Sequence, residues 1–223
     1  MKIYRILFTM FLICPVLSSC ASVSDFVSED LHMSPEYAEK VGLFVHEKPE
    51  SFYYPGTTTL DTSNMMAYHQ MQVLPFNCQN VLQQIFPEVE MNMEDTQEIK
   101  FKSQDLAGYF EIKILKLRYD WPDPKATKFR ADVELLADFR RPNGRLVWRE
   151  TFNGEGIGFT DTNLGLTRFG REATTALEDA FREVVYSMQD GVKKSQEIMM
   201  YLREFQAEKE LESGSVTPSV STA

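Results

Sequence analysis

The sequence predicts an α+β fold: an antiparallel sheet of about four strands, amphipathic helices packed on one of its faces, and a C-terminal helical extension. Residues 129–140 alternate apolar and charged side chains with a period of two, as a strand buried on one face does, and only Leu136 departs from the charged face. The turn sequence RPNGR at residues 141–145 then favours a hairpin. Residues 167–188 gather their apolar side chains on one face of a long helix. These observations favour a single domain with helices on one face of the sheet.

The amino terminus has the pattern of a lipoprotein leader. Lys2 and Arg5 precede an apolar segment at residues 6–17, which is shorter than the roughly 20 residues that a membrane-spanning helix needs. Residues 17–20, LSSC, resemble the lipobox of bacterial lipoprotein precursors, and a simple signal peptide is the alternative. This resemblance implies cleavage before Cys20, acylation of Cys20 (palmitate among the acyl chains), and, with Ala21 rather than Asp next, sorting to the outer membrane.

Composition and charge describe the mature chain. We expect residues 1–19 to be the signal peptide, 20–39 a flexible tether from the lipidated Cys20, and 40–191 the α+β domain. Residues 192–211 form a C-terminal helix in this prediction, and 212–223 a disordered tail.

Loss of Lys2 and Arg5 with the leader takes the formal net charge from -10 to -12. A field of this sign repels nucleic acid and anionic headgroups, so we predict no nucleic-acid partner.

The cysteines leave no intramolecular disulfide to support the fold. Of the three, Cys14 is removed with the leader and Cys20 carries lipid, so Cys78 is the remaining thiol. It could pair between chains or react. However, it shares one helical face with apolar residues at i+3, i+4, i+7 and i+8, which favours a buried small hydrophobe.

The first part of the domain begins with a compact apolar run at residues 41–45, a predicted strand. Residues 49–63 have the composition of a loop. The aromatic side chains within it, Phe52, Tyr53 and Tyr54, either fold over the core, which we favour, or form an exposed binding patch.

A helix follows, with a possible start near residue 64 and a firm part at residues 76–86. Pro75 either breaks it or stands in the first turn of a second helical piece. Residues 89–93 are a candidate short edge strand.

Residues 106–119 form a predicted strand whose apolar face changes near Leu115, which indicates a β-bulge. Residues 146–152 are the predicted hairpin partner of residues 129–140. The alternating glycines at 154, 156 and 158 lack the spacing of a dinucleotide-binding turn, and residues 161–165 lack the paired acidic positions and the closing Glu of a calcium loop. A bulged strand end and an ordinary loop explain both.

Two helices end the chain. We expect the long helix at residues 167–188 to end or bend at Gly191. The second apolar stripe, within residues 192–211, has two interpretations that the sequence leaves open. Either the helix packs on the domain, or it binds a partner or a second copy of the chain.

The sequence contains no catalytic motif of the zinc-peptidase, CxxC, nucleophile-elbow or phosphate-loop kind. The histidines, His32, His46 and His69, are widely spaced, and the charges on the polar faces are interpreted as solvation. We therefore predict no catalytic residue, no metal site and no cofactor, and leave ligand-binding residues unassigned. A hydrolase that brings two carboxylates together only in space is the least favoured class.

The segment 129–188, including NGRLVW at 143–148 before FNGEG at 152–156, is similar to small outer-membrane lipoproteins. It resembles the YajG-like family and the auxiliary lipoproteins of lipid-transporting ABC systems, and more distantly the LptE-type fold. The resemblance implies a non-enzymatic protein anchored in the outer membrane, with its domain facing the periplasm. Its expected role is that of an accessory component of an envelope transport or assembly complex, which binds a protein partner or lipid. The alternative is a structural envelope lipoprotein that self-associates through residues 192–211.

Overall fold

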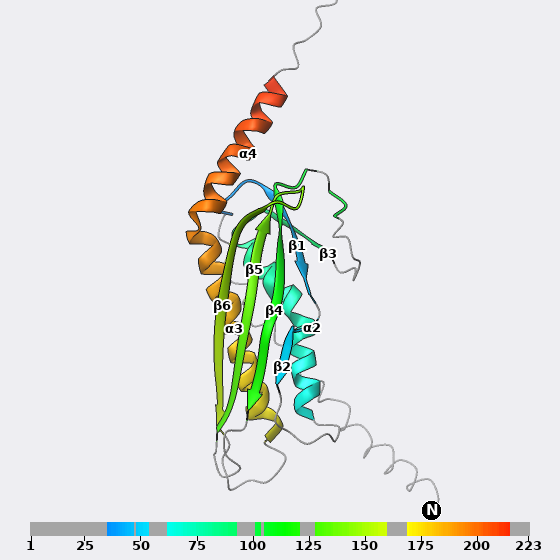
Figure 1. Cartoon of the computed structure of the whole chain (residues 1–223), viewed down its shortest axis with the longest axis vertical. Helices are drawn as coiled ribbons and strands as arrows, with labels where there is room; N and C mark the ends of the chain where they lie inside the picture. Colours follow the sequence, from blue (N-terminus) through cyan, green and yellow to red (C-terminus); the bar gives the residue numbers. More distant parts are fainter. Residues whose placement is uncertain are drawn as a thin grey trace, which may run out of the picture.

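The computed structural model describes residues 35–46, 48–53, 62–92, 101–103, 105–120, 128–159 and 169–214. Six strands and three helices lie in these ranges (Figure 1). In chain order they are β1 Lys40–Val45, β2 Ser51–Tyr53, α2 Thr62–Gln83, β3 Glu88–Asn92, β4 Gly108–Asp120, β5 Lys128–Arg140, β6 Leu146–Phe159, α3 Phe169–Lys194 and α4 Gln196–Gly214.

The strands form one mixed sheet in the order β3-β1-β4-β5-β6, with β2 also paired to β4. β1 lies parallel to both of its neighbours, and β2 lies parallel to β4 farther along the same edge. Between β1 and β2 the backbone stays beside β4, because His46 N donates to Ile112 O at 2.9 Å and Glu50 N to Ile114 O at 2.8 Å. β1 and β2 therefore act as one interrupted strand along β4.

This topology corrects part of the predicted fold. The three longest strands, β4, β5 and β6, form the expected antiparallel meander. The prediction of a wholly antiparallel sheet of about four strands is wrong, because β1, β2 and β3 add parallel pairs. Residues 51–53 were expected in a loop and form a strand instead. Parallel neighbours require a crossover connection, and here α2 lies between β1 and β3 in the chain.

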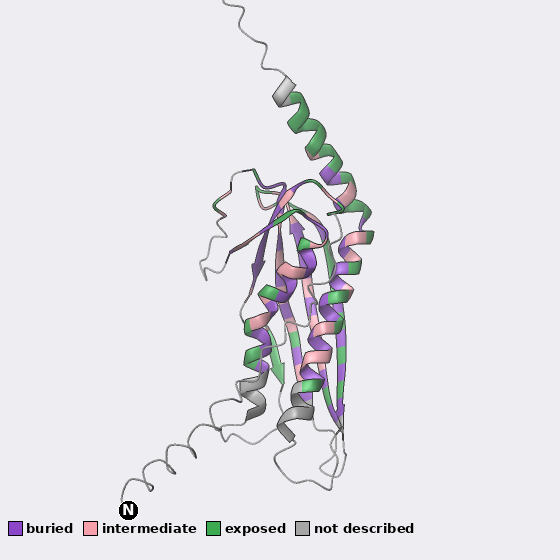
Figure 2. Cartoon of the chain, turned by 180° about the vertical axis from the view of Figure 1, so that it is seen from behind, coloured by how far each residue is buried: buried purple, intermediate pink, exposed green. Residues whose placement is uncertain are grey.

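All three described helices lie on one side of the sheet, and none of them covers the opposite side (Figures 1 and 2). α3 packs over β5 and β6 and against α2, which also contacts β1 and β3. The core between helices and sheet includes fully buried Phe86, Phe110, Phe139 and Phe181. The register of β4 against β5 shifts between Ile114 and Lys116, which confirms the predicted bulge.

α2 is one continuous helix with Pro75 inside it. Pro75 therefore neither breaks the helix nor begins a second piece. Cys78 is fully buried in the core, and burial raises the pKa of its thiol to about 12. This environment confirms the interpretation of Cys78 as a small buried hydrophobe, since the reactive thiolate is strongly disfavoured there.

β6 continues through the glycine run to Phe159 in unbroken register with β5, so these residues form neither a bulged strand end nor a loop. A Cβ atom on Gly156 would lie 1.8 Å from Ala176 O, and one on Gly154 would lie 2.1 Å from Ala180 O. The glycines therefore let the backbone of α3 lie directly on β6. Gly191 was expected to end or bend the helix, but α3 passes through it to Lys194.

α4 starts after a break at Ser195, whose Oγ accepts a hydrogen bond from Ile198 N at 3.2 Å, as a helix N-cap does. Its first half packs on the domain through buried Ile198, Tyr201 and Leu202. Its second half is exposed and projects beyond the end of the sheet (Figures 1 and 2). The structure thus confirms packing on the domain for the first half of this helix.

Candidate functional site: the uncovered face of the sheet

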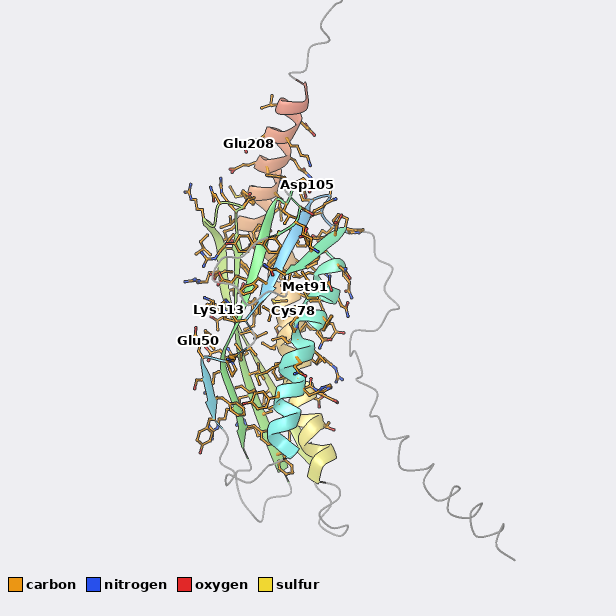
Figure 3. The ribbon with its side chains drawn as sticks, turned by 90° about the vertical axis from the view of Figure 1, so that its right-hand side faces the viewer. Glu50, Cys78, Met91, Asp105, Lys113 and Glu208 are labelled. Atoms are coloured by element: carbon orange, nitrogen blue, oxygen red, sulfur yellow. The ribbon has the colours of Figure 1, made fainter. Side chains whose placement is uncertain are left out.

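The uncovered face is built by every second residue of the long strands. On β5 the residues between the buried apolar ones are Arg130, Asp132, Glu134, Leu136, Asp138 and Arg140. The strand register places charged residues of β4 and β6 beside them, so that Glu111, Asp138 and Arg149 form one row across the sheet. Lys113 extends on this side, away from α2 (Figure 3). We call this surface the open face.

An ion network lies on the open face: Glu111 and Asp138 with His46, Lys113, Arg140 and Arg149. Asp138 is its most buried member, with only 1% of its side chain exposed. Arg149 donates to both of its oxygens, Nε to Oδ1 at 2.6 Å and Nη2 to Oδ2 at 2.7 Å, and Arg140 also donates to Oδ2. Burial alone would raise the pKa of Asp138, but the hydrogen bond from Arg149 and the charges of Arg140 and Arg149 lower it below its ordinary value.

Glu111 is the second carboxylate of the ion network. Its Oε2 accepts a hydrogen bond from Arg140 Nε at 2.8 Å, while Oε1 lies 2.9 Å from His46 Nε2 and 3.1 Å from Lys113 Nζ. Burial works to raise its pKa, but hydrogen bonds with His46 and Lys113 and the charges of Lys113 and Arg140 lower it. Both oxygens are therefore engaged, and the carboxylate is held in its ionised form.

Farther along the open face, a shallow hollow of about 470 Å³ lies over β4, β5 and β6. Charges of both signs line it, among them Lys116, Arg130, Asp132 and Glu134. At its rim, Glu183 of α3 reaches past β6 and accepts a hydrogen bond from Glu155 N at 2.7 Å. A helix side chain thus occupies a backbone donor of the edge strand, which limits pairing with another strand there.

Of the aromatic side chains of β2, Tyr53 lies on the open face beside Arg118, whereas Phe52 lies on the same side of the sheet as buried Leu117. Phe52 is 38% and Tyr53 51% exposed, and the Arg118 guanidinium lies 5.6 Å from the centre of the Tyr53 ring. The favoured prediction that these rings fold over the core is wrong for both. They are exposed because β2 is a short strand at the edge of the sheet rather than a loop above the core. Tyr54 lies outside the described residues.

The residues singled out in the sequence do not converge on one site. Cys20, His32 and the faint calcium-like segment at 161–165 lie outside the described residues. His69 is exposed on α2, whereas His46 belongs to the ion network. In the described part of the chain, no group of three or more metal-ligating side chains is found. No described helix is both long and apolar enough to cross a membrane.

The ion network is the feature that sequence reasoning missed. Charges on polar strand faces were interpreted as solvated, yet Asp138 is almost completely covered and Glu111 is 11% exposed. The sequence contained a usable signal. Acidic residues of β4 and β5 and basic residues of β4, β5 and β6 stand at alternating positions along their strands. Pairing these strands as hairpins brings the charged residues side by side. The pairing of β4 with β5 was the missing information.

Chemically, the ion network is suited to recognition more than to proton transfer. A general base works best with a pKa near the operating pH, whereas Glu111 is held below its ordinary value. The His46–Glu111 pair does not line the hollow at Lys116. Fixed charges of both signs on an accessible sheet face can instead orient a complementary surface.

Comparisons with known proteins give no family for this chain: no family model matches it, and no curated protein matches it. Among solved structures, one from Helicobacter pylori, described as a neuraminyllactose-binding hemagglutinin homolog, has a TM-score of 0.49 at 9% identity and covers 81% of this chain and 96% of its own. A Xanthomonas campestris protein of family DUF330 has a TM-score of 0.40 at 13% identity and covers 70% and 83%. A minor lipoprotein from Acinetobacter baumannii has a TM-score of 0.36 at 9% identity and covers 71% and 92%. None of the three is described as YajG-like or LptE-type.

Proposed function

We propose that this chain is a lipid-anchored protein of the bacterial envelope that acts by binding rather than by catalysis. Acyl chains on Cys20 hold it in the outer membrane with its domain in the periplasm, and the open face binds a protein partner. Its role is that of an accessory component of an envelope transport or assembly complex. The leader with its LSSC sequence supports the anchor, and the open face supports the binding role.

The observation that carries the binding role is the ion network on a sheet face that none of the described helices covers (Figure 1). Its side chains are held by one another before any partner arrives, so little side-chain entropy is lost on binding. Arg149 is 50% and Lys113 29% exposed, which leaves both available to a partner's acidic groups. Charge complementarity of this kind fixes orientation and speeds association.

The same surface favours a protein partner over lipid. An acyl chain laid on the open face would desolvate several charged groups without replacing their hydrogen bonds, which is unfavourable. The hollow at Lys116 is lined largely by charged side chains rather than by the apolar side chains that enclose lipid tails. A folded partner with charges of its own satisfies these groups.

Site-specific photo-cross-linking in intact cells tests the proposal. A photo-reactive residue replaces Thr151 or Asn153, which are exposed on the open face, and in a matched control it replaces exposed Gln72 on α2. We expect a discrete cross-linked protein from positions 151 and 153 and none from position 72. Adding Lys116→Glu to the position 151 variant should weaken that band at least tenfold. Equal cross-linking from position 72, or none from the open face, contradicts the proposal.

A further inference from the structure

A second hollow, of about 440 Å³, lies on the helix side at the end of the sheet, away from the open face. It is formed between the segment entering β1, the residues just before β4, and α4. Figure 3 shows Asp105 near the start of the projecting part of α4, with Glu208 farther out along it. The residues that line the hollow are Ala38, Glu39, Lys40, Asp105, Phe205, Gln206, Lys209 and Glu210.

Glu39 is the unusual residue of this hollow. Only 8% of it is exposed, and its Oε2 is buried without a hydrogen-bond partner. Side chains alternate along a strand, so Glu39 extends to the same side as Val41 and Leu43, which are fully buried under the helices. It is therefore directed toward α4 and into the hollow that it lines.

No basic side chain forms an ion pair with Glu39 in the described part of the chain. Lys40 extends to the other side of the strand, where its Nζ lies 2.8 Å from Glu88 Oε2 and 3.7 Å from Asp105 Oδ2. On α4, Arg203 and Lys209 form no ion pair with Glu39 in the described part of the chain. Tyr37, two residues earlier on the same side, also has a buried hydroxyl without a partner.

An unpaired carboxylate is costly to bury, and a cation placed beside it removes most of that cost. We propose that this hollow is a binding site for a ligand that carries a positively charged amino group on an aliphatic chain. Glu39 accepts the ammonium hydrogen bonds, Asp105 adds negative charge at the rim, and Phe205 packs against the methylene groups. The ligand is either a lysine side chain of a protein or a free aliphatic diamine.

The chemistry of the lining selects an amine over a metal ion. A divalent ion such as Ca²⁺ takes about six to eight oxygen ligands, and no group of three or more metal-ligating side chains is found among the residues that the structure describes. A single ammonium needs only one or two acceptors, which Glu39 provides. The acidic net charge of the chain raises the local concentration of such cations. The site is separate from the open face, so the inference does not depend on the proposed partner.

Two probes test the site by NMR titration and calorimetry on the full chain in non-ionic detergent: cadaverine, and the tripeptide Gly-Lys-Gly with acetylated and amidated ends. Their uncharged counterparts are 1-pentanol and the same tripeptide with norleucine. We expect saturable binding of at least one amine probe, shifts of the amides of residues 38–40 and 205–210, and no binding of the uncharged counterparts. Glu39→Gln should weaken binding at least tenfold, and Asp105→Asn two- to threefold.

Glu208→Gln, on the exposed part of α4 outside the hollow, is the matched control and should leave the affinity unchanged. Glu39→Gln is isosteric and removes a buried charge, so the melting temperature of this variant should equal or exceed that of the wild type. Measuring it separates a loss of binding from a loss of folding. Binding of the tripeptide alone assigns the site to a protein lysine, and binding of cadaverine alone to a free amine. If neither amine binds, or if Glu39→Gln binds as tightly as the wild type, the inference is wrong.

Discussion

Asp138 shows how a single side chain can connect the strands of an otherwise open sheet face. Its two oxygens join Arg140 of its own strand to Arg149 of β6, and Arg140 also bonds Glu111 of β4. The carboxylate thus ties three strands together through their side chains. Removing it leaves two guanidinium groups next to each other without the charge that holds them.

We predict that Asp138→Asn lowers the free energy of unfolding at neutral pH by about 3 kcal/mol. This value is at the low end of the range for breaking a buried ion pair, because the side chain of Arg149 is half exposed. Its effect depends on pH. The folded-state pKa values of Asp138 and Glu111 are lowered, so their contribution is complete above the ordinary carboxyl pKa and is lost as pH falls through the folded pKa. Urea unfolding between pH 7 and pH 3 should show a shallower acid loss in the variant than in the wild type.

Asp190→Asn is the matched control for this prediction. Asp190 pairs with Lys194 at 2.5 Å on an exposed helix face, with 60% and 73% of their side chains exposed, and such pairs contribute about 0–1 kcal/mol. If the two variants lose equal stability, or if the acid profile of Asp138→Asn matches that of the wild type, the ion network does not stabilise the sheet.

Gly156 sets the distance between β6 and α3. A Cβ atom there would lie 1.8 Å from Ala176 O, a backbone atom that moves only if the whole helix moves. We predict that Gly156→Ala lowers the free energy of unfolding by about 3 kcal/mol, which overpacking of this kind costs. Asn153→Ala, exposed on the same strand, should change it by less than about 0.5 kcal/mol. Equal urea midpoints for the two variants would mean that α3 is free to shift.

At the scale of single residues, the sequence predicted which side chains of β5 face the core. It did not predict how deeply the polar side chains of β5 are buried. The alternation from Phe129 to Phe139 is borne out residue by residue. The burial of Asp138 depends on Arg149, eleven residues away on the next strand, and on the side-chain positions of both. A period-two pattern carries no information on such pairs.

Among the elements, β1 shows why the sheet topology was only half predicted. All five residues after Lys40 in this strand are buried, on both faces. Such a run is typical of a strand between parallel neighbours, whereas β5 alternates as an antiparallel strand with one covered face does. The apolar run 41–45 therefore contained the signal for a parallel position. The short β2 had no comparable signal, since three residues show no period.

α4 divides into a packed half and a free half, which allows a test by truncation. A chain ending at Gln206 keeps buried Ile198, Tyr201 and Leu202, and its free energy of unfolding should stay within about 0.5 kcal/mol of the full chain. A chain ending at Ser195 loses all three, together with the bond from Tyr201 Oη to Ala107 O at 2.6 Å. We predict a loss of more than about 4 kcal/mol, at roughly 1.5–3 kcal/mol for each large apolar side chain.

Light scattering on the chain ending at Gln206 also tests self-association. The apolar stripe of α4 is used by the domain, so we expect the same molar mass per particle with and without the residues beyond Gln206. A full chain that forms oligomers and a shortened chain that does not would favour the structural, self-associating alternative over a separate protein partner.

The whole molecule combines a predicted lipid anchor at Cys20 with a folded domain that has one open face. The described residues form a sheet with helices on one face and charges on the other, and the segment that leads back to Cys20 enters the sheet at β1, near α4 (Figure 1). The sequence predicted the anchor from a local motif, whereas the open face could not be predicted without the strand order.

Mass spectrometry of the protein purified from its native membrane tests the central claim most directly. The account predicts a mature chain that begins at Cys20, lacks residues 1–19, and carries a mass increase for the acyl chains on that residue. Cys20→Ser should abolish both the cleavage and the mass increase. An unmodified Cys20 still joined to Ser19 and the leader would contradict the account.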